Sequence, residues 1–172
     1  MTPPLFHVSD DPNIEIFEPR THATWPDLGP RVWAVEDCML HTFFVPRDCP
    51  RVTFYALDSS TDEDVETYLD GDRSNFTVRV EQEWFERIQS ATLYLYQLPD
   101  DSFTSFDTGA GYWVSNGAVK PSSMDTISSL PDAMTQRNID FSPVPSLWPL
   151  FDAVAASTLQ FSMIRMRFAQ PR

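Results

Sequence analysis

Fifteen prolines spread along the 172 residues limit the length of every regular element in this chain. Proline has no amide hydrogen to donate and clashes with the preceding helical turn, so it interrupts helix interiors and central strands. Only five glycines accompany these prolines. We therefore expect many short elements joined by stiff turns, and we exclude a bundle of long helices.

Apolar residues occur in short runs, several of which alternate as strands do. We expect about seven strands, among them residues 5–8, 32–35, 52–57, 92–98 and 111–115, with a long closing strand over residues 160–169. About four short helices are expected, among them residues 83–90, 123–137 and 147–155. Because helices and strands do not alternate regularly, the pattern predicts an α+β fold with a mixed, mainly antiparallel sheet.

The length predicts a single domain over residues 1–172 with one sizeable core. Hydrophobic residues make up 42% of the chain and aromatic residues 13%, which excludes a disordered protein. No apolar run approaches the roughly 20 residues of a membrane span. The first residues lack the features of a secretory signal, so we expect a cytoplasmic protein with reduced cysteines.

Charge restricts the partners. The net charge of -13 repels nucleic acid and anionic lipid, so we expect a small-molecule substrate and neither of those partners. Eleven of the twelve basic residues are arginine, and Lys120 is the exception. Arginine suits bidentate contact with a carboxylate or phosphate, although biased codon composition would give the same excess. The oligomeric state is left open.

The segment of residues 45–56 places Arg47, Asp48, Cys49 and Arg51 between prolines at the entrance of an apolar strand. Charged groups that leave water need partners, which here are either internal, as in a structural latch, or a bound anion. The positive charges of the neighbouring arginines favour a lowered pKa of the Cys49 thiol, and a lowered pKa would make this thiol reactive. A buried structural thiol is the alternative.

The first strand carries the candidate catalytic residues, His7 and Ser9. Because they are two positions apart, both lie on the strand face opposite Val8. Histidine is the usual proton donor and acceptor near neutral pH, and a histidine bonded to neighbouring backbone is the alternative.

The candidate substrate-binding residues are arginines near strand ends and aromatic residues. An anionic group would be held by Arg20, Arg47, Arg51 and Arg165, the last sharing a strand face with Arg167. Trp33, Tyr112 and Trp113 would stack on a planar ring, or else fill the core.

Metal and cofactor signals are weak. Cys38, His41 and Cys49 lack the paired spacings of a zinc site, and the acidic run of residues 58–72 lacks the ligand spacing of a calcium loop. No dinucleotide-binding, P-loop, hydrolase-elbow or zincin motif is present in the sequence. We therefore expect neither a metal nor a resident cofactor.

Several motifs together resemble a family of small, uncharacterised, mostly bacterial proteins that is known as a domain of unknown function. The motifs are Leu5-Phe6-His7-Val8-Ser9, Val32-Trp33-Ala34, residues 46–56, Gly111-Tyr112-Trp113-Val114-Ser115, Leu147-Trp148-Pro149-Leu150 and Ile164-Arg165-Met166-Arg167. They span nearly the whole chain, and this resemblance implies no established activity.

The first third also resembles, more loosely, the opening of ADP-ribosyltransferase-like folds. In those folds a histidine of the first strand lines the NAD site. In this sequence His7 matches that histidine, and Ser9 lies beside it on the same strand. This resemblance implies NAD as a substrate.

We therefore expect a small enzyme that binds a nucleotide-like or other small polar or anionic substrate in a cleft lined by His7, arginines and aromatic residues. Its class would be transferase-like. The alternatives are a cofactor-free isomerase, cyclase or lyase with an aromatic-lined pocket, and a non-catalytic acidic module that binds a basic partner.

Overall fold

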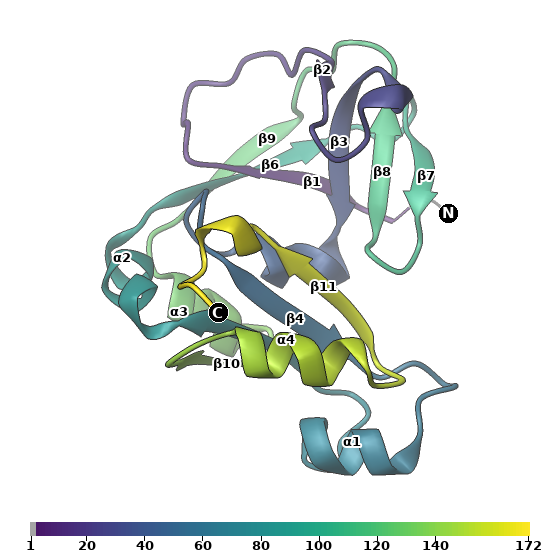
Figure 1. Ribbon diagram of the computed structural model, residues 1–172. Coiled ribbons are helices and arrows are strands. Elements are labelled where there is room, and N and C mark those ends of the chain that lie inside the picture. Colours follow the sequence, from purple (N-terminus) through teal and green to yellow (C-terminus); the bar gives the residue numbers. More distant parts are fainter. Residues whose placement is uncertain (1–2) are drawn as a thin grey trace. The chain divides into compact units, whose positions relative to one another are not determined.

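The computed structural model describes residues 3–172 and shows an α+β protein with two sheets (Figure 1). The chain folds into two compact units. The first comprises residues up to 40 and residues 92–127, and the second comprises residues 41–91 and 128–172. Each sheet belongs to one unit. The predicted α+β class is confirmed, whereas the single domain stays a prediction.

The first unit is built on a fully antiparallel seven-stranded sheet of order β7-β8-β3-β1-β6-β9, with β2 paired to β3. Its strands are β1 (Leu5–Ser9), β2 (Arg20–Thr21), β3 (Pro30–Glu36), β6 (Leu93–Leu98), β7 (Thr104–Asp107), β8 (Tyr112–Ser115) and β9 (Ser123–Ile127). A 3-10 helix, η1 (Pro26–Leu28), lies in the loop between β2 and β3, and η2 (Asp37–Phe43) follows β3.

One face of this sheet carries the core of the first unit. Leu5, Ala34, Tyr96 and Leu98 pack there with Phe17 and other buried residues. The Tyr96 hydroxyl donates to Asp11 O at 2.7 Å, so the segment after β1 is tied to the core.

The second unit contains a four-stranded sheet of order β10-β5-β4-β11, in which only β10 and β5 are parallel. Its strands are β4 (Arg51–Tyr55), β5 (Phe76–Glu81), β10 (Ile139–Val144) and β11 (Gln160–Ile164). Its helices are α1 (Asp62–Leu69), α2 (Phe85–Ser90), α3 (Leu130–Gln136) and α4 (Trp148–Ala155), with 3-10 helices η3 (Gln82–Trp84) and η4 (Met166–Phe168).

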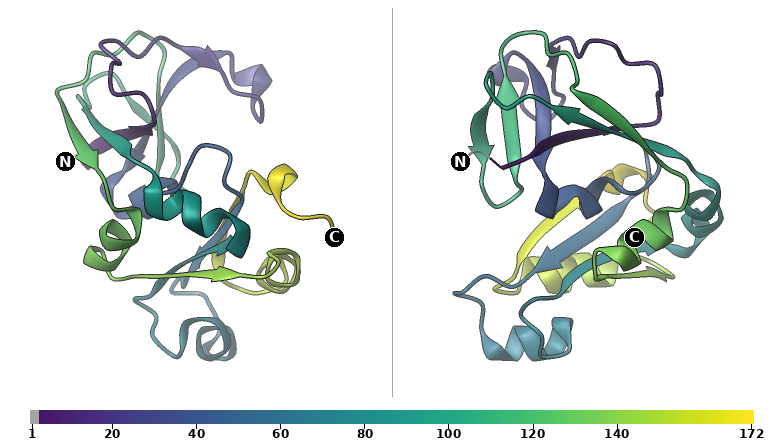
Figure 2. Two further views of the ribbon diagram at one scale, coloured as in Figure 1. Left: turned by 90° about the vertical axis from the view of Figure 1, so that its left-hand side faces the viewer. Right: turned by 180° about the vertical axis from the view of Figure 1, so that it is seen from behind.

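Helices cover both faces of the four-stranded sheet. Val65 of α1 and Val154 of α4 pack with Phe54 of β4 in the core on one face. Helix α2 lies on the opposite face (Figure 2). Its Phe85 stacks on Phe141 of β10, with 6.3 Å between the ring centroids. The strands nevertheless keep polar residues, such as Arg79 of β5 and Asp140 of β10, whose side chains form an ion pair of 2.6 Å.

Two expected elements differ from the structure. The closing strand ends at Ile164, because Arg165 adopts a left-handed conformation with φ 60° and begins η4. Arg165 and Arg167 therefore do not share a strand face. The helix expected over residues 123–137 is instead β9 followed by α3, since β9 gains its hydrogen bonds by pairing with β6. None of the helices in residues 3–172 is long and apolar enough to cross a membrane.

Candidate ligand-binding face

Strand register places Trp33 and Tyr112 on one face of the seven-stranded sheet and Trp113 on the other. Trp33 is paired with Val114, and Tyr112 with Val35, whereas Trp113 is paired with the buried Ala34. Residues paired across antiparallel strands project to the same side, and successive residues to opposite sides. Trp113 accordingly packs against the core.

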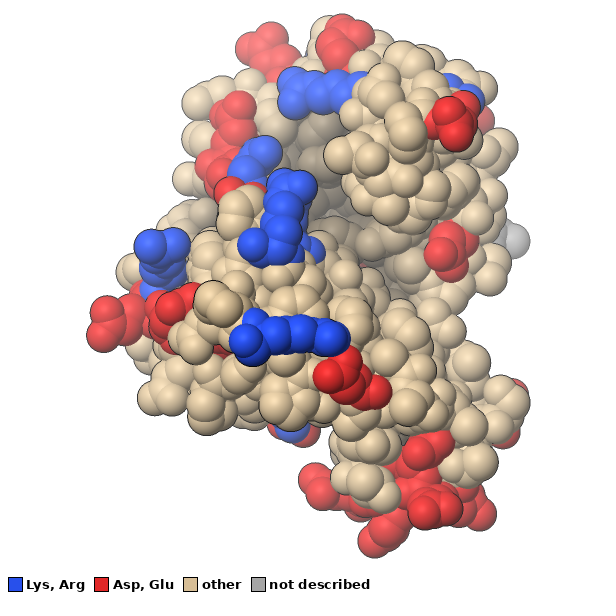
Figure 3. Space-filling model, viewed as in Figure 1, with Lys and Arg blue, Asp and Glu red and all other residues tan. Residues whose placement is uncertain are grey.

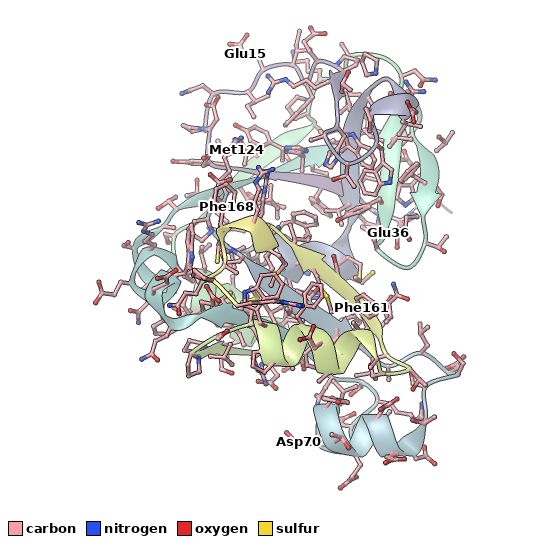
Figure 4. The ribbon with its side chains drawn as sticks, viewed as in Figure 1. Glu15, Glu36, Asp70, Met124, Phe161 and Phe168 are labelled. Atoms are coloured by element: carbon pink, nitrogen blue, oxygen red, sulfur yellow. The ribbon has the colours of Figure 1, made fainter. Side chains whose placement is uncertain are left out.

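Trp113 is also fixed at its polar end. Its Nε1 donates to Glu36 Oε1 at 2.7 Å, and Glu36 lies at the end of β3 away from β2 (Figure 4). This indole therefore fills a structural position.

Five rings gather on the Trp33 face. Trp25 stacks on Trp33 with centroids 5.0 Å apart and planes at 22°, and Tyr112 meets Trp33 edge-on at 5.9 Å. His22 lies 5.0 Å from Trp33, and Phe106 lies 5.1 Å from it. We call these residues the Trp33 cluster: His22, Trp25, Trp33, Phe106 and Tyr112.

The Trp33 cluster is only partly covered by protein. Phe106 is 36% exposed, His22 is exposed, and the other three rings are half-buried. The Trp33 Nε1 atom is buried and has no hydrogen-bond partner among residues 3–172. A group of stacked rings that is partly open to solvent is typical of a binding surface for planar molecules.

Two arginines flank the Trp33 cluster at the β2–β3 pair. Arg20 is paired directly with Arg31 across these strands. Arg31 lies two positions before Trp33, and Arg20 lies two positions before His22, so both arginines project to the face that carries the rings. The 5.0 Å contact between His22 and Trp33 agrees with that placement.

His7 and Ser9 project to the opposite face, where Leu5 is buried. His7 Nδ1 donates to Trp33 O at 2.9 Å, and its ring lies 4.7 Å from the buried Phe17. Ser9 Oγ accepts the N–H of Asp11 at 3.1 Å. The structure thus brings Arg20, Trp33 and Tyr112 together and leaves His7 and Ser9 on the other face.

The segment of residues 45–56 belongs to the second unit, and several of its polar groups have partners there. Arg51 is 4% exposed, and it donates from Nε to Thr42 O at 2.9 Å and from Nη1 to Cys49 O at 3.0 Å. Asp48 Oδ1 lies 3.9 Å from Arg165 Nε. Arg47 and Arg165 are exposed. The observed contacts of Arg51 and Asp48 are internal, as in a structural latch.

Burial has the largest effect on the pKa of the Cys49 thiol. It raises the pKa of Cys49 to about 12, with a smaller contribution from the negative charge of Glu81 and an opposing one from Arg51. Since the thiolate is the reactive form, Cys49 is an inert structural thiol near neutral pH.

Histidine, cysteine and carboxylate side chains form no group suited to a metal ion within residues 3–172. The acids of residues 58–72 surround α1, where they form an exposed acidic surface (Figure 3). Thr61 caps this helix by accepting the N–H of Asp64 at 3.2 Å. The acidic run is therefore a capped, solvated helix.

Comparison with known proteins places the chain in a family. The model of a family of unknown function (DUF6886) matches residues 6–169, nearly the whole sequence. The chain belongs to this family. That membership confirms the resemblance to an uncharacterised family. No curated protein and no solved structure matches the chain. The looser resemblance to ADP-ribosyltransferase-like folds is therefore not supported by these comparisons.

Sequence reasoning did not assign four members of this face to a ligand site: His22, Trp25, Arg31 and Phe106. Trp25 and His22 come from a loop without periodicity, and Phe106 lies at an irregular register step of β7. Only Arg31 carried a local signal, its position two residues before Trp33 at the start of an apolar strand.

Proposed function

We propose that this protein binds a small, planar, anionic molecule of the nucleotide class on the Trp33 face. The ring of the ligand stacks against the Trp33 cluster, and its anionic group lies toward Arg20. The bound molecule is the small-molecule substrate of the transferase-like reaction expected above, and NAD is one member of this class.

The parallel stack of Trp25 on Trp33, closed by Tyr112 at a right angle and partly open to solvent, carries this proposal. Stacking of one nucleobase on an aromatic side chain contributes about 1–3 kcal/mol. Two half-buried indoles with an adjacent phenol offer such a surface at little entropic cost, because these side chains have few rotatable bonds.

The Trp33 face supports binding more directly than it supports a reaction. His7 projects from the other face of the sheet, so an acid or base for chemistry at this face would come from another residue. The isomerase or lyase alternative is less well supported, since Trp113 cannot line one pocket with Trp33 and Tyr112.

Intrinsic tryptophan fluorescence and thermal shift with AMP, ADP-ribose and NAD test the proposal. We expect saturable quenching and a higher melting temperature with at least one of them, as for any ligand that binds only the folded state. In Trp33→Ala the affinity falls by about tenfold or more, in line with the loss of one stacking contact.

A matched control is Trp84→Phe, which changes a half-buried indole of the second unit that lies beside Arg87. This variant is expected to bind like the wild type. Absence of quenching and of stabilisation by all three ligands would overturn the proposal.

A further inference from the structure

Two arginines face each other directly across β2 and β3. Arg20 and Arg31 are register partners, a relationship that brings their Cβ atoms to about 4.5–5.5 Å. Like charges in this position destabilise a sheet. The Arg20–Arg31 pair therefore lowers the stability of the sheet rather than adding to it.

Neither arginine is neutralised by an acid. Within residues 3–172, neither Arg20 nor Arg31 makes an ion pair, although acidic residues outnumber basic residues by 25 to 12 in the chain. Glu18 and Asp27 are the acidic residues nearest in sequence to Arg20 and to the start of β3. Both are exposed, and neither forms an ion pair with Arg20 or Arg31. Arg31 Nη1 donates to Pro30 O at 2.7 Å, which holds one part of its guanidinium in place.

The arginine pair lies beside the Trp33 cluster. Two residues along a strand cover about 6.5–7 Å, so Arg31 is separated from Trp33 by roughly that distance along β3. A sugar that joins a base to a phosphate spans such a gap. The backbone positions of Arg31 and Trp33 are thus separated by about the span between the base and the phosphate of one nucleotide.

We infer that Arg20 and Arg31 form a clamp for the phosphate group of a nucleoside monophosphate or a similar phosphate ester. A carboxylate is satisfied by one guanidinium, whereas a phosphate dianion has oxygen atoms for two, and its charge removes the repulsion between them. This inference rests on the proposed function, which it deepens by naming the ligand class and adding Arg31 as a binding residue.

A comparison of AMP with adenosine by isothermal titration tests the clamp. Both ligands stack, but only AMP carries the phosphate. A hydrogen bond to a charged group contributes about 1.5–3 kcal/mol, so the wild type is expected to bind AMP about ten- to a hundredfold more tightly than adenosine at low salt. The advantage shrinks as salt is raised.

In Arg31→Gln and in Arg20→Gln the ratio of the two affinities falls toward one, while adenosine binding is unchanged. Arg31→Lys retains the charge without the bidentate geometry and gives an intermediate ratio. Arg87→Gln, in the second unit, is the control and keeps the wild-type ratio. Circular dichroism melts check that each variant is folded.

The two proposals fail in different ways. Equal affinities for adenosine and AMP in the wild type would overturn the clamp while the stacking site stands. Equal affinities for AMP and adenosine 5′-carboxylate would overturn the assignment to phosphate. Binding of none of these ligands would overturn the stacking site, and the clamp with it.

Discussion

The backbone N–H of Gln170 donates a hydrogen bond of 2.9 Å to Oε2 of Glu81, a residue that is fully buried. Oε1 of the same carboxylate accepts the N–H of Leu147 at 3.3 Å, just before α4. A buried charge requires such partners, because it has lost its hydration. Glu81 therefore joins the end of β5 to α4 and to the last residues of the chain.

Replacing Glu81 with alanine should lower the free energy of unfolding by about 2–5 kcal/mol, because the buried N–H of Leu147 and the part-buried N–H of Gln170 lose their acceptor. Urea unfolding followed by tryptophan fluorescence measures the change. Glu83→Ala is the matched control, since Glu83 is exposed and its Oε2 accepts a hydrogen bond from the Gln170 side chain at 3.4 Å. We expect it to stay within about 0.5 kcal/mol of the wild type. Equal effects of the two substitutions would contradict the assignment.

The two thiols should differ in reactivity toward a disulfide reagent. Cys49 is buried and its pKa is raised to about 12, so it should react only when the protein unfolds. Cys38 is exposed, but its pKa is raised by partial burial and by Glu36, so it should react slowly at pH 8 and faster as the pH increases. Absorbance at pH 7–10 follows both reactions.

Glu36→Gln should accelerate the Cys38 reaction, because it removes the negative charge and keeps an oxygen that accepts the Trp113 N–H. Cys38→Ser should abolish the reaction in the native protein. A native Cys49 that reacts as fast as Cys38 would refute the assignment of Cys49 as a buried thiol.

Asp64 should stabilise the protein in a pH-dependent way. Its Oδ2 accepts hydrogen bonds from Thr158 N at 2.7 Å and from Thr158 Oγ1 at 2.5 Å, and these bonds lower the pKa of Asp64. Since the pKa is lower in the folded state than in the unfolded state, the stabilisation is complete above about pH 4 and is lost as the pH falls through the lowered pKa.

The carboxyl resonance of Asp64, followed by NMR between pH 2 and 7, should titrate below the usual range of aspartate. Thr158→Val removes the hydroxyl donor and should shift this titration upward, whereas Glu63→Gln, an exposed change on the same helix, should not. An unshifted titration in Thr158→Val would argue against the hydroxyl as the cause.

Gly111 should tolerate no side chain. Its φ is 65°, and a Cβ atom would lie 2.8 Å from Met39 Cγ. Gly111→Ala should therefore cost about 1–3 kcal/mol of unfolding free energy, from left-handed backbone strain and from displacement of Met39. Gly117→Ala is the control, because within residues 3–172 no heavy atom outside its two chain neighbours lies within 4 Å of its added Cβ. Similar urea midpoints for the two variants would contradict this account.

Several strands were predictable from the sequence, because each corresponds to a short local run of apolar residues. The apolar runs at residues 5–8, 52–57, 92–98 and 111–115 coincide closely with β1, β4, β6 and β8. By contrast β9 is exposed and rich in polar side chains, and it is a strand because β6 supplies its hydrogen bonds. Pairing with a distant partner leaves no signature in local composition.

The candidate site was predictable only in part. Trp33, Tyr112 and Arg20 were recognised by residue type, but their side of the sheet depends on register, which also separates them from His7, Ser9 and Trp113. A shift of one residue would exchange the two faces. Trp25 and His22 join the Trp33 cluster through a loop, and loop geometry does not follow from periodicity.

By itself the sequence determined the α+β class, the short elements, the acidic surface and the family, because proline spacing, hydrophobic alternation, charge count and motif order are written along the chain. Tertiary structure alone decided that Arg20 opposes Arg31, that Trp25 covers Trp33 and that Arg51 turns inward. The reason is physical: those relationships are set by pairing between distant strands and by burial, and neither is encoded within any short stretch of residues.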